Sequence, residues 1–180
     1  MAKERLEKGL IEIYTGNCKG KSTASFGLAI RGAGQGFQVR IVQFMKCGGY
    51  GENISLEKLK PEIEVYSYGR KCFIMPEAEA KQQDIDLAAK AMAKAEELMT
   101  DGNTDILILD EINNAIFFHL VTVAEVEALL DKRPDYMEVV LTGRNAPQAL
   151  IDRAGLVTEM REIKHPFTSC GLKTRKGIEY

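Results

Sequence analysis

Short apolar runs alternate along the chain with stretches in which apolar residues recur at helical spacing. We predict six strands in these runs, at residues 9–14, 39–45, 62–66, 105–110, 137–141 and 156–163. The run at 105–110 (DILILD) is almost continuously apolar, which is typical of a strand buried on both faces. The sheet should therefore have helices on both sides.

Helical spacing fills the intervals between the runs. Residues 22–33 and 76–99 are two examples, and the second carries apolar residues at three- and four-residue steps. Thr122 and Glu125 form a capping-box pattern before a third helix at 123–130.

Strands separated by helices pair in parallel through right-handed crossovers. The pattern therefore predicts an α/β fold, a three-layer α/β/α sandwich around a mostly parallel sheet of about six strands. A chain of 180 residues has the size of one domain, so we expect residues 1–180 to form a single domain.

The net charge of −2 gives no general attraction to nucleic acid or to anionic membranes, and we expect neither as a partner. No apolar run approaches the roughly 20 residues that span a bilayer, and the charged N-terminus does not resemble a secretion signal. We expect a cytoplasmic protein with reduced thiols. The spacing of Cys47, Cys72, His165 and Cys170 does not match known zinc patterns, so a metal site there is disfavoured.

The first predicted strand is followed by the segment TGNCKGKST, residues 15–23, directly before a predicted helix. It is close to the phosphate-loop pattern GxxxxGK[ST]. Gly16 and Gly20 permit tight turns, so that backbone N–H groups can point at phosphate oxygens. Lys21 supplies a full positive charge, and Ser22 can bind magnesium.

This loop departs from the usual pattern in one way. Three residues separate Gly16 from Gly20, so Thr15 occupies the position of the usual first glycine. The alternative interpretation is a glycine-rich turn with solvated lysines, but a GKST sequence at a helix start favours phosphate binding.

Charged residues that suit a polyphosphate stand at the ends of two further predicted strands. Asp110 and Glu111 follow the buried strand, where an acid can hold magnesium as in a Walker B element, and either could be the direct ligand. Favourable acids at a helix N-terminus are the alternative. Arg144 follows the strand at 137–141 and can reach the same phosphates, unless it forms a surface salt bridge.

Three other features leave two interpretations each. The glycine-rich residues 46–52 suit a substrate loop or a plain connection. Tyr66, Tyr68 and Phe73 could face a flat hydrophobic ligand, although aromatic residues are more often core. The basic tail, residues 164–180, either folds over the site or is solvated.

A site that holds and neutralises a polyphosphate suits attack at phosphorus or attack at carbon with triphosphate as the leaving group. The first would make the chain a P-loop kinase or NTPase acting at the γ-phosphate. A non-enzymatic nucleotide-binding module is a third possibility.

The chain resembles the ATP:corrinoid adenosyltransferases of the P-loop type from about Gly9 to Tyr180. The resemblance rests on segments that include the shortened loop and the chain's ending, namely YTGNCKGKSTASFGLAIRG, VQFMK, ILDEIN, LTGRNAP and KHPFTSCGLKTRKGIEY. The family loop ordinarily reads GNGKGK, so Cys18 replaces a glycine. The implied fold is P-loop NTPase-like.

The resemblance implies that Co(I) of a reduced corrinoid attacks C5′ of ATP and releases triphosphate, in adenosylcobalamin biosynthesis or salvage. Lys21 and Glu111 would be catalytic, Ser22 and Glu111 would hold Mg²⁺ with support from Asp110, and Arg144 would contact the nucleotide. The residues implied to bind ATP are Gly16, Asn17, Cys18, Lys19, Gly20, Lys21, Ser22 and Thr23.

In relatives, aromatic residues press on the lower face of the corrinoid. Phe73 is the first candidate for this role here and Tyr68 the second. The resemblance also implies a homodimer and an electron donor, such as a flavoprotein, that reduces the corrinoid.

Overall fold

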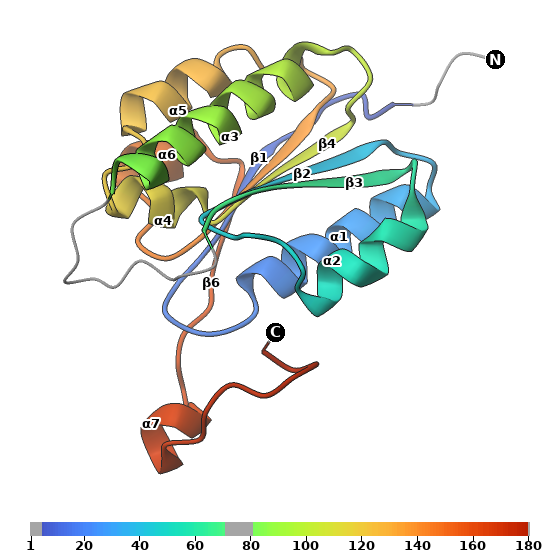
Figure 1. Ribbon diagram of the computed structural model, residues 1–180. Helices are drawn as coiled ribbons and strands as arrows, with labels where there is room; N and C mark the ends of the chain where they lie inside the picture. Colours follow the sequence, from blue (N-terminus) through green and yellow to red (C-terminus); the bar gives the residue numbers. More distant parts are fainter. Residues whose placement is uncertain (1–4, 71–80, 180) are drawn as a thin grey trace.

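The computed structural model describes residues 5–70 and 81–179, and its centre is a six-stranded parallel sheet (Figure 1). The strand order is β3-β2-β4-β5-β1-β6. The strands are β1 (Ile11–Thr15), β2 (Val39–Phe44), β3 (Ile63–Tyr68), β4 (Ile106–Asp110), β5 (Glu138–Thr142) and β6 (Leu156–Glu159). The predicted α/β class and the six strands are confirmed.

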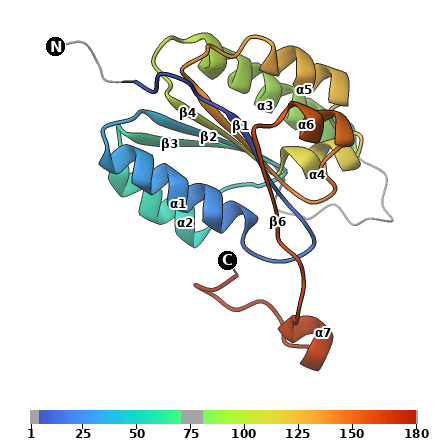
Figure 2. The same cartoon turned by 180° about the vertical axis from the view of Figure 1, so that it is seen from behind.

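Helices cover both faces of the sheet and make the three predicted layers (Figures 1 and 2). One face carries α1 (Lys21–Gly34), α2 (Gly51–Leu56) and the 3-10 turn η1 (Glu57–Leu59). The other carries α3 (Gln82–Thr100), α4 (Ile112–Phe117), α5 (Val123–Leu130) and α6 (Gln148–Arg153). The short α7 (Pro166–Cys170) lies beyond β6, away from the sheet.

The sheet separates two apolar clusters. Leu107 and Leu109 of β4 pack towards α3 and its neighbours, whereas Ile106 and Ile108 pack towards α1. Successive side chains of a strand point to opposite faces, so a strand that is covered on both sides has no polar alternation. This is why the segment DILILD is almost continuously apolar.

Some element boundaries differ from the prediction. The helix predicted from residue 76 begins at Gln82 in the structure, because Lys81 has an extended backbone with ψ 154°; residues 71–80 lie outside the described part. The last strand ends at Glu159, four residues early. The capping box of α5 is confirmed, with the Glu125 N–H donating to Thr122 Oγ1 at 3.2 Å.

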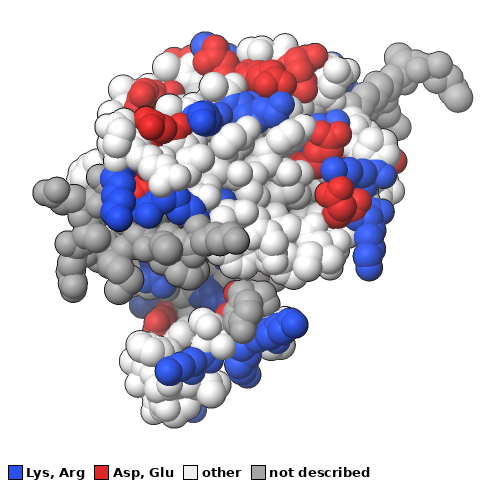
Figure 3. Space-filling view, in the orientation of Figure 1, with Lys and Arg blue, Asp and Glu red and all other residues white. Residues whose placement is uncertain are grey.

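Charged side chains of both signs are interspersed over the face that Figure 3 shows, with a group of basic side chains on the protruding C-terminal segment. Within residues 5–70 and 81–179, no helix combines the length and the apolar character that crossing a bilayer requires.

A carboxyl pair lies on β1 and β5, away from the strand ends that carry the phosphate loop. Glu138 Oε2 accepts the N–H of Leu10 at 2.7 Å, and Glu12 stands beside it. Burial raises the pKa of Glu138 to about 7; the Leu10 N–H opposes the shift, and the neighbouring Glu12 adds to it. Native Glu138 therefore keeps its proton at pH values where the unfolded chain has lost it.

This difference makes stability fall as pH rises, because the unfolded state binds fewer protons in that window. We expect the free energy of unfolding to decrease between about pH 4.5 and 7 and then to level off. Glu138→Gln should flatten this decrease and stabilise the protein at pH 8 by about 1 kcal/mol, after allowance for solvent screening. Urea unfolding at several pH values measures it. The exposed Glu7→Gln is the control, and an unchanged profile in Glu138→Gln would contradict the assignment.

Candidate functional site

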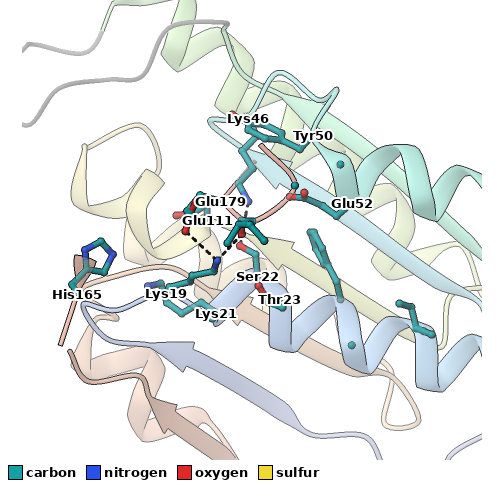
Figure 4. Close-up of a pocket in the computed structure, with 17 residues that line it drawn as sticks. Lys19, Lys21, Ser22, Thr23, Lys46, Tyr50, Glu52, Glu111, His165 and Glu179 are labelled. Atoms are coloured by element: carbon teal, nitrogen blue, oxygen red, sulfur yellow. Dashed lines mark hydrogen bonds and ion pairs between the residues drawn. The ribbon is translucent and has the colours of Figure 1, made fainter. Parts of the chain in front are cut away.

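A cavity of about 690 Å³ opens at the carboxyl ends of the strands, where α1 begins. This volume is typical of a small-molecule site, and the strand ends are where α/β sheets bind ligands. Figure 4 shows side chains that line it, among them Lys19, Lys21, Ser22, Thr23, Lys46, Tyr50, Glu52, Glu111, His165 and Glu179. The predicted loop and one of the predicted acids therefore meet in one place.

The phosphate loop turns sharply at both of its glycines. Gly16 has φ 99° and Gly20 has φ 124°, values that favour glycine. Met160, just past β6, braces the loop from outside: its carbonyl accepts the N–H of Cys18 at 3.1 Å, and its own N–H donates to Thr15 O at 2.8 Å. A Cβ on Gly16 would lie 2.4 Å from the Met160 carbonyl oxygen.

Lys21 begins α1, and its ammonium closes the loop from within. It is 8% exposed, and Nζ donates to the carbonyls of Gly16 at 2.9 Å and Cys18 at 2.7 Å. Burial lowers the pKa of Lys21, and the nearby Glu111 carboxylate partly opposes this. The helix N-terminus adds a partial positive charge at the same point, so the loop suits an anion.

Asp110 is fully buried at the end of β4 and accepts four hydrogen bonds. Its donors are Ser22 Oγ at 2.7 Å, Lys46 Nζ at 2.7 Å, Thr142 Oγ1 at 2.8 Å and Gln43 Nε2 at 3.2 Å. Burial alone would raise its pKa, but the Lys46 charge and these hydrogen bonds outweigh it and hold the pKa below the usual range. Asp110 is therefore ionised at neutral pH.

Glu111 differs from Asp110 because its side chain lines the cavity. Its backbone is left-handed, with φ 66°, and its N–H donates to Thr142 Oγ1 at 2.9 Å. Burial and the charge of Asp110 raise the pKa of Glu111. Asn114 Nδ2 donates to its carboxylate. Of the two acids, Glu111 is thus the one presented to a ligand, and Asp110 orients the groups around it.

Lys46 belongs to the site, but the sequence analysis assigned it no role of its own and placed it only in the glycine-rich segment 46–52. Burial alone would lower its pKa, but the Asp110 and Glu111 carboxylates raise it above the usual value. Its position directly after the strand at 39–45 was the available signal, since that strand ends at the same edge as the others. Met160 carried no such signal, because its contribution is made by backbone groups.

The oxygens around Ser22 fit a divalent cation. A hydroxyl and two carboxylates are ligands that Mg²⁺ prefers, and the ammonium of Lys46 already stands in for a cation there, 2.7 Å from Asp110 Oδ2 and 3.1 Å from Ser22 Oγ. Among the described residues, no three His, Cys, Asp or Glu side chains form a metal-binding group. A magnesium ion here would therefore complete its coordination with water or with phosphate oxygens.

The remaining predicted residues lie in different places. Arg144 is exposed at the end of β5, and its N–H donates to Asn114 Oδ1 at 2.9 Å. Tyr68 packs against the core on the α3 side and lines a separate hollow of about 10 Å³. Asn17 is exposed on the loop. Phe73 lies outside the described residues.

Residues 177–179 of the C-terminal tail reach the phosphate loop, as one of the two interpretations of the tail predicts, although most side chains between residues 164 and 179 are exposed. Lys19 Nζ donates to the carbonyl of Ile178 and lies 3.6 Å from the Glu179 carboxylate. Ile178 and Glu179 line the cavity, as does His165. The tail therefore forms one wall of the site.

A glycine-rich loop between β1 and α1, with a buried acid at the end of β4 of a parallel sheet, is consistent with a P-loop NTPase-like fold. Comparison with known proteins is more specific. The family model described as "ATP:corrinoid adenosyltransferase BtuR/CobO/CobP" matches residues 7–180. The chain belongs to this family.

Individual relatives agree with the family model. A corrinoid adenosyltransferase of Sinorhizobium sp is 42% identical over the whole chain and 84% of its own length. Corrinoid adenosyltransferases of Pseudomonas aeruginosa and Escherichia coli K12 are 34% and 32% identical, again over the whole chain, and 88% and 90% of their own lengths are covered.

The contact between Gly16 and Met160 predicts a stability effect. Gly16→Ala should lower the free energy of unfolding by roughly 2 kcal/mol or more, because the new Cβ meets the Met160 backbone at a positive φ. Gly34→Ala is the matched control, since a Cβ there meets nothing within 4 Å and should be neutral or slightly stabilising. Denaturant unfolding measures both, and equal stability of the two variants would contradict the bracing role of Met160.

Proposed function

We propose that this chain transfers the 5′-deoxyadenosyl group of ATP to the Co(I) centre of a corrinoid and releases triphosphate, in adenosylcobalamin biosynthesis or salvage. The observation that carries the proposal is the shortened phosphate loop, closed by Lys21, in a chain of the ATP:corrinoid adenosyltransferase family. The names of the relatives, corrinoid adenosyltransferase, support the same reaction.

The reaction requires little acid–base catalysis by the protein. Co(I) supplies the electron pair of the new cobalt–carbon bond, and the C5′–O bond breaks with its pair leaving on triphosphate. The nucleophile carries no proton, so no general base is needed. The protein must align C5′ with cobalt and stabilise the charge of the leaving triphosphate, which are positioning and electrostatic effects.

Loop N–H groups and Lys21 would hold the phosphates, together with the other loop residues from Gly16 to Thr23 and with Arg144. Mg²⁺, when bound, would neutralise phosphate charge, with Ser22 and Glu111 as its ligands and Asp110 orienting Ser22. Lys21 and Glu111 are the residues that we propose as catalytic.

The corrinoid must lose its lower axial ligand before Co(II) is reduced easily. Phe73 and then Tyr68 are the candidates for pressing on that face.

We further propose that residues 1–180 form a single domain, that the protein works as a homodimer, and that a flavoprotein or similar donor reduces the cobalt. The described cysteines Cys18, Cys47 and Cys170 are free thiols, which suits a cytoplasmic setting.

The test is to mix the protein, MgATP and chemically reduced cobalamin without oxygen. A light-sensitive adenosylated product and intact triphosphate should form. Lys21→Ala should slow the reaction by roughly 100-fold or more, because the leaving group loses a preorganised positive charge. Lys132→Ala is the control, since Lys132 pairs with Glu96 on the exposed surface and should leave the rate unchanged.

The products separate this function from its rivals. ADP or free phosphate would favour a kinase or NTPase that acts at the γ-phosphate. Tight ATP binding without turnover of any reduced corrinoid would favour a non-enzymatic nucleotide-binding module. Normal activity in Lys21→Ala would remove the phosphate-loop assignment.

A further inference from the structure

Lys46 reaches the phosphate-loop edge from a different part of the chain. It follows β2, and Figure 4 shows its side chain extending from its own loop towards Ser22. Its ammonium lies 2.7 Å from Asp110 Oδ2 and 3.1 Å from Ser22 Oγ, and its side chain is 16% exposed. A fixed positive charge therefore lies against Ser22 Oγ, which the proposed function gives to a metal ion, and against Asp110, which orients Ser22.

The surrounding structure directs the side chain to this point. Met45, just before Lys46, has a left-handed backbone with φ 58° that turns the chain at the end of β2. The rings of Phe26 and Tyr50 each lie with their centroid 5.9 Å from Nζ, within the range at which an aromatic face attracts a cation. The ammonium is thus held by oxygens on one side and by aromatic rings on others.

A divalent ion and this ammonium cannot share the position. Both would contact Ser22 Oγ, and two positive charges bound to one hydroxyl oxygen repel strongly where water is scarce. The Lys46 side chain has free space into which it can move, because it lines the cavity of about 690 Å³ in which the phosphates would lie. A phosphate oxygen there offers the ammonium a replacement partner.

We propose that Lys46 is a resident counter-cation that keeps divalent metal away from Ser22 until a nucleotide triphosphate draws its ammonium away from Ser22 and Asp110. This inference rests on the proposed function, since it takes the nucleotide to be the ligand of the cavity. Its consequence is an order of events in which the metal enters with the nucleotide and not before it.

Mn²⁺ binding without nucleotide tests the proposal, with electron paramagnetic resonance counting the free ion. Lys46→Met should bind Mn²⁺ roughly tenfold more tightly than wild type, a usual size for coupling between neighbouring sites. Lys46→Arg keeps the charge and should resemble wild type, as should the remote control Lys132→Met. On addition of ATP, the difference between wild type and Lys46→Met should shrink.

A second measurement checks that the variant is folded. Mg²⁺ alone should raise the thermal midpoint of Lys46→Met and leave that of wild type unchanged, because a ligand stabilises only the state that binds it. Should Lys46→Met fail to fold, Lys46→Gln takes its place. Equal Mn²⁺ affinity of wild type and the uncharged variant would overturn the proposal and reduce Lys46 to a structural ion pair.

The two proposals can fail separately. The Mn²⁺ titration contains no corrinoid, so a tighter metal site in Lys46→Met stands even where the cobalamin assay yields no adenosylated product. Adenosyl transfer together with unchanged Mn²⁺ affinity in Lys46→Met would keep the proposed function and remove the role of Lys46.

Discussion

The buried carboxylate of Asp110 is the group on which the site depends. An ionised side chain without solvent is costly unless every oxygen is partnered, and Asp110 has four partners. They come from the start of α1 (Ser22), from β2 (Gln43), from the loop after β2 (Lys46) and from β5 (Thr142). Hydrogen bonds to this one carboxylate thereby connect the neighbouring strands β2, β4 and β5 with helix α1 at one edge of the sheet. Removing any donor would leave part of that charge unpartnered, so the geometry around Ser22 is held far more firmly than its exposed surroundings.

The C-terminal tail, which covers the phosphate loop, is held less firmly than the loop itself. Backbone hydrogen bonds between Thr15, Cys18 and Met160 hold the loop, the floor of the site, and fix the directions of its amides before a ligand arrives. The tail is attached to the loop through Lys19, whose ion pair with Glu179 has side chains 47% and 21% exposed, so water screens it and it contributes little to stability. A rigid floor and a weakly held cover suit a site that must admit a charged ligand and then align it.

Local pattern predicted most of the fold, because burial on both faces leaves a clear apolar signature in strands such as β4. The loop at 15–23 was equally visible, since its glycines and Lys21 meet requirements local to one turn. The contacts of Met160 and Lys46 were not visible, because they depend on the strand order that brings β6 beside β1 and β2 beside β4. Helix α2 was missed as well, since its six residues begin in a glycine-rich segment and are too short to display a period.

The charges around the cavity bear on the proposed role of a metal ion. Lysines and glutamates line it in equal number, namely Lys19, Lys21, Lys46, Glu52, Glu111 and Glu179. Asp110 behind them adds a further negative charge, which lies against Lys46. With Asp110 included, four acids face three lysines, although the loop and the start of α1 present dipoles that favour an anion. Dipoles alone cannot neutralise a triphosphate, and under the proposed role of Lys46 its ammonium would turn to the phosphates only if another cation balanced Asp110. An incoming polyphosphate that brings its own divalent ion satisfies both requirements in one step.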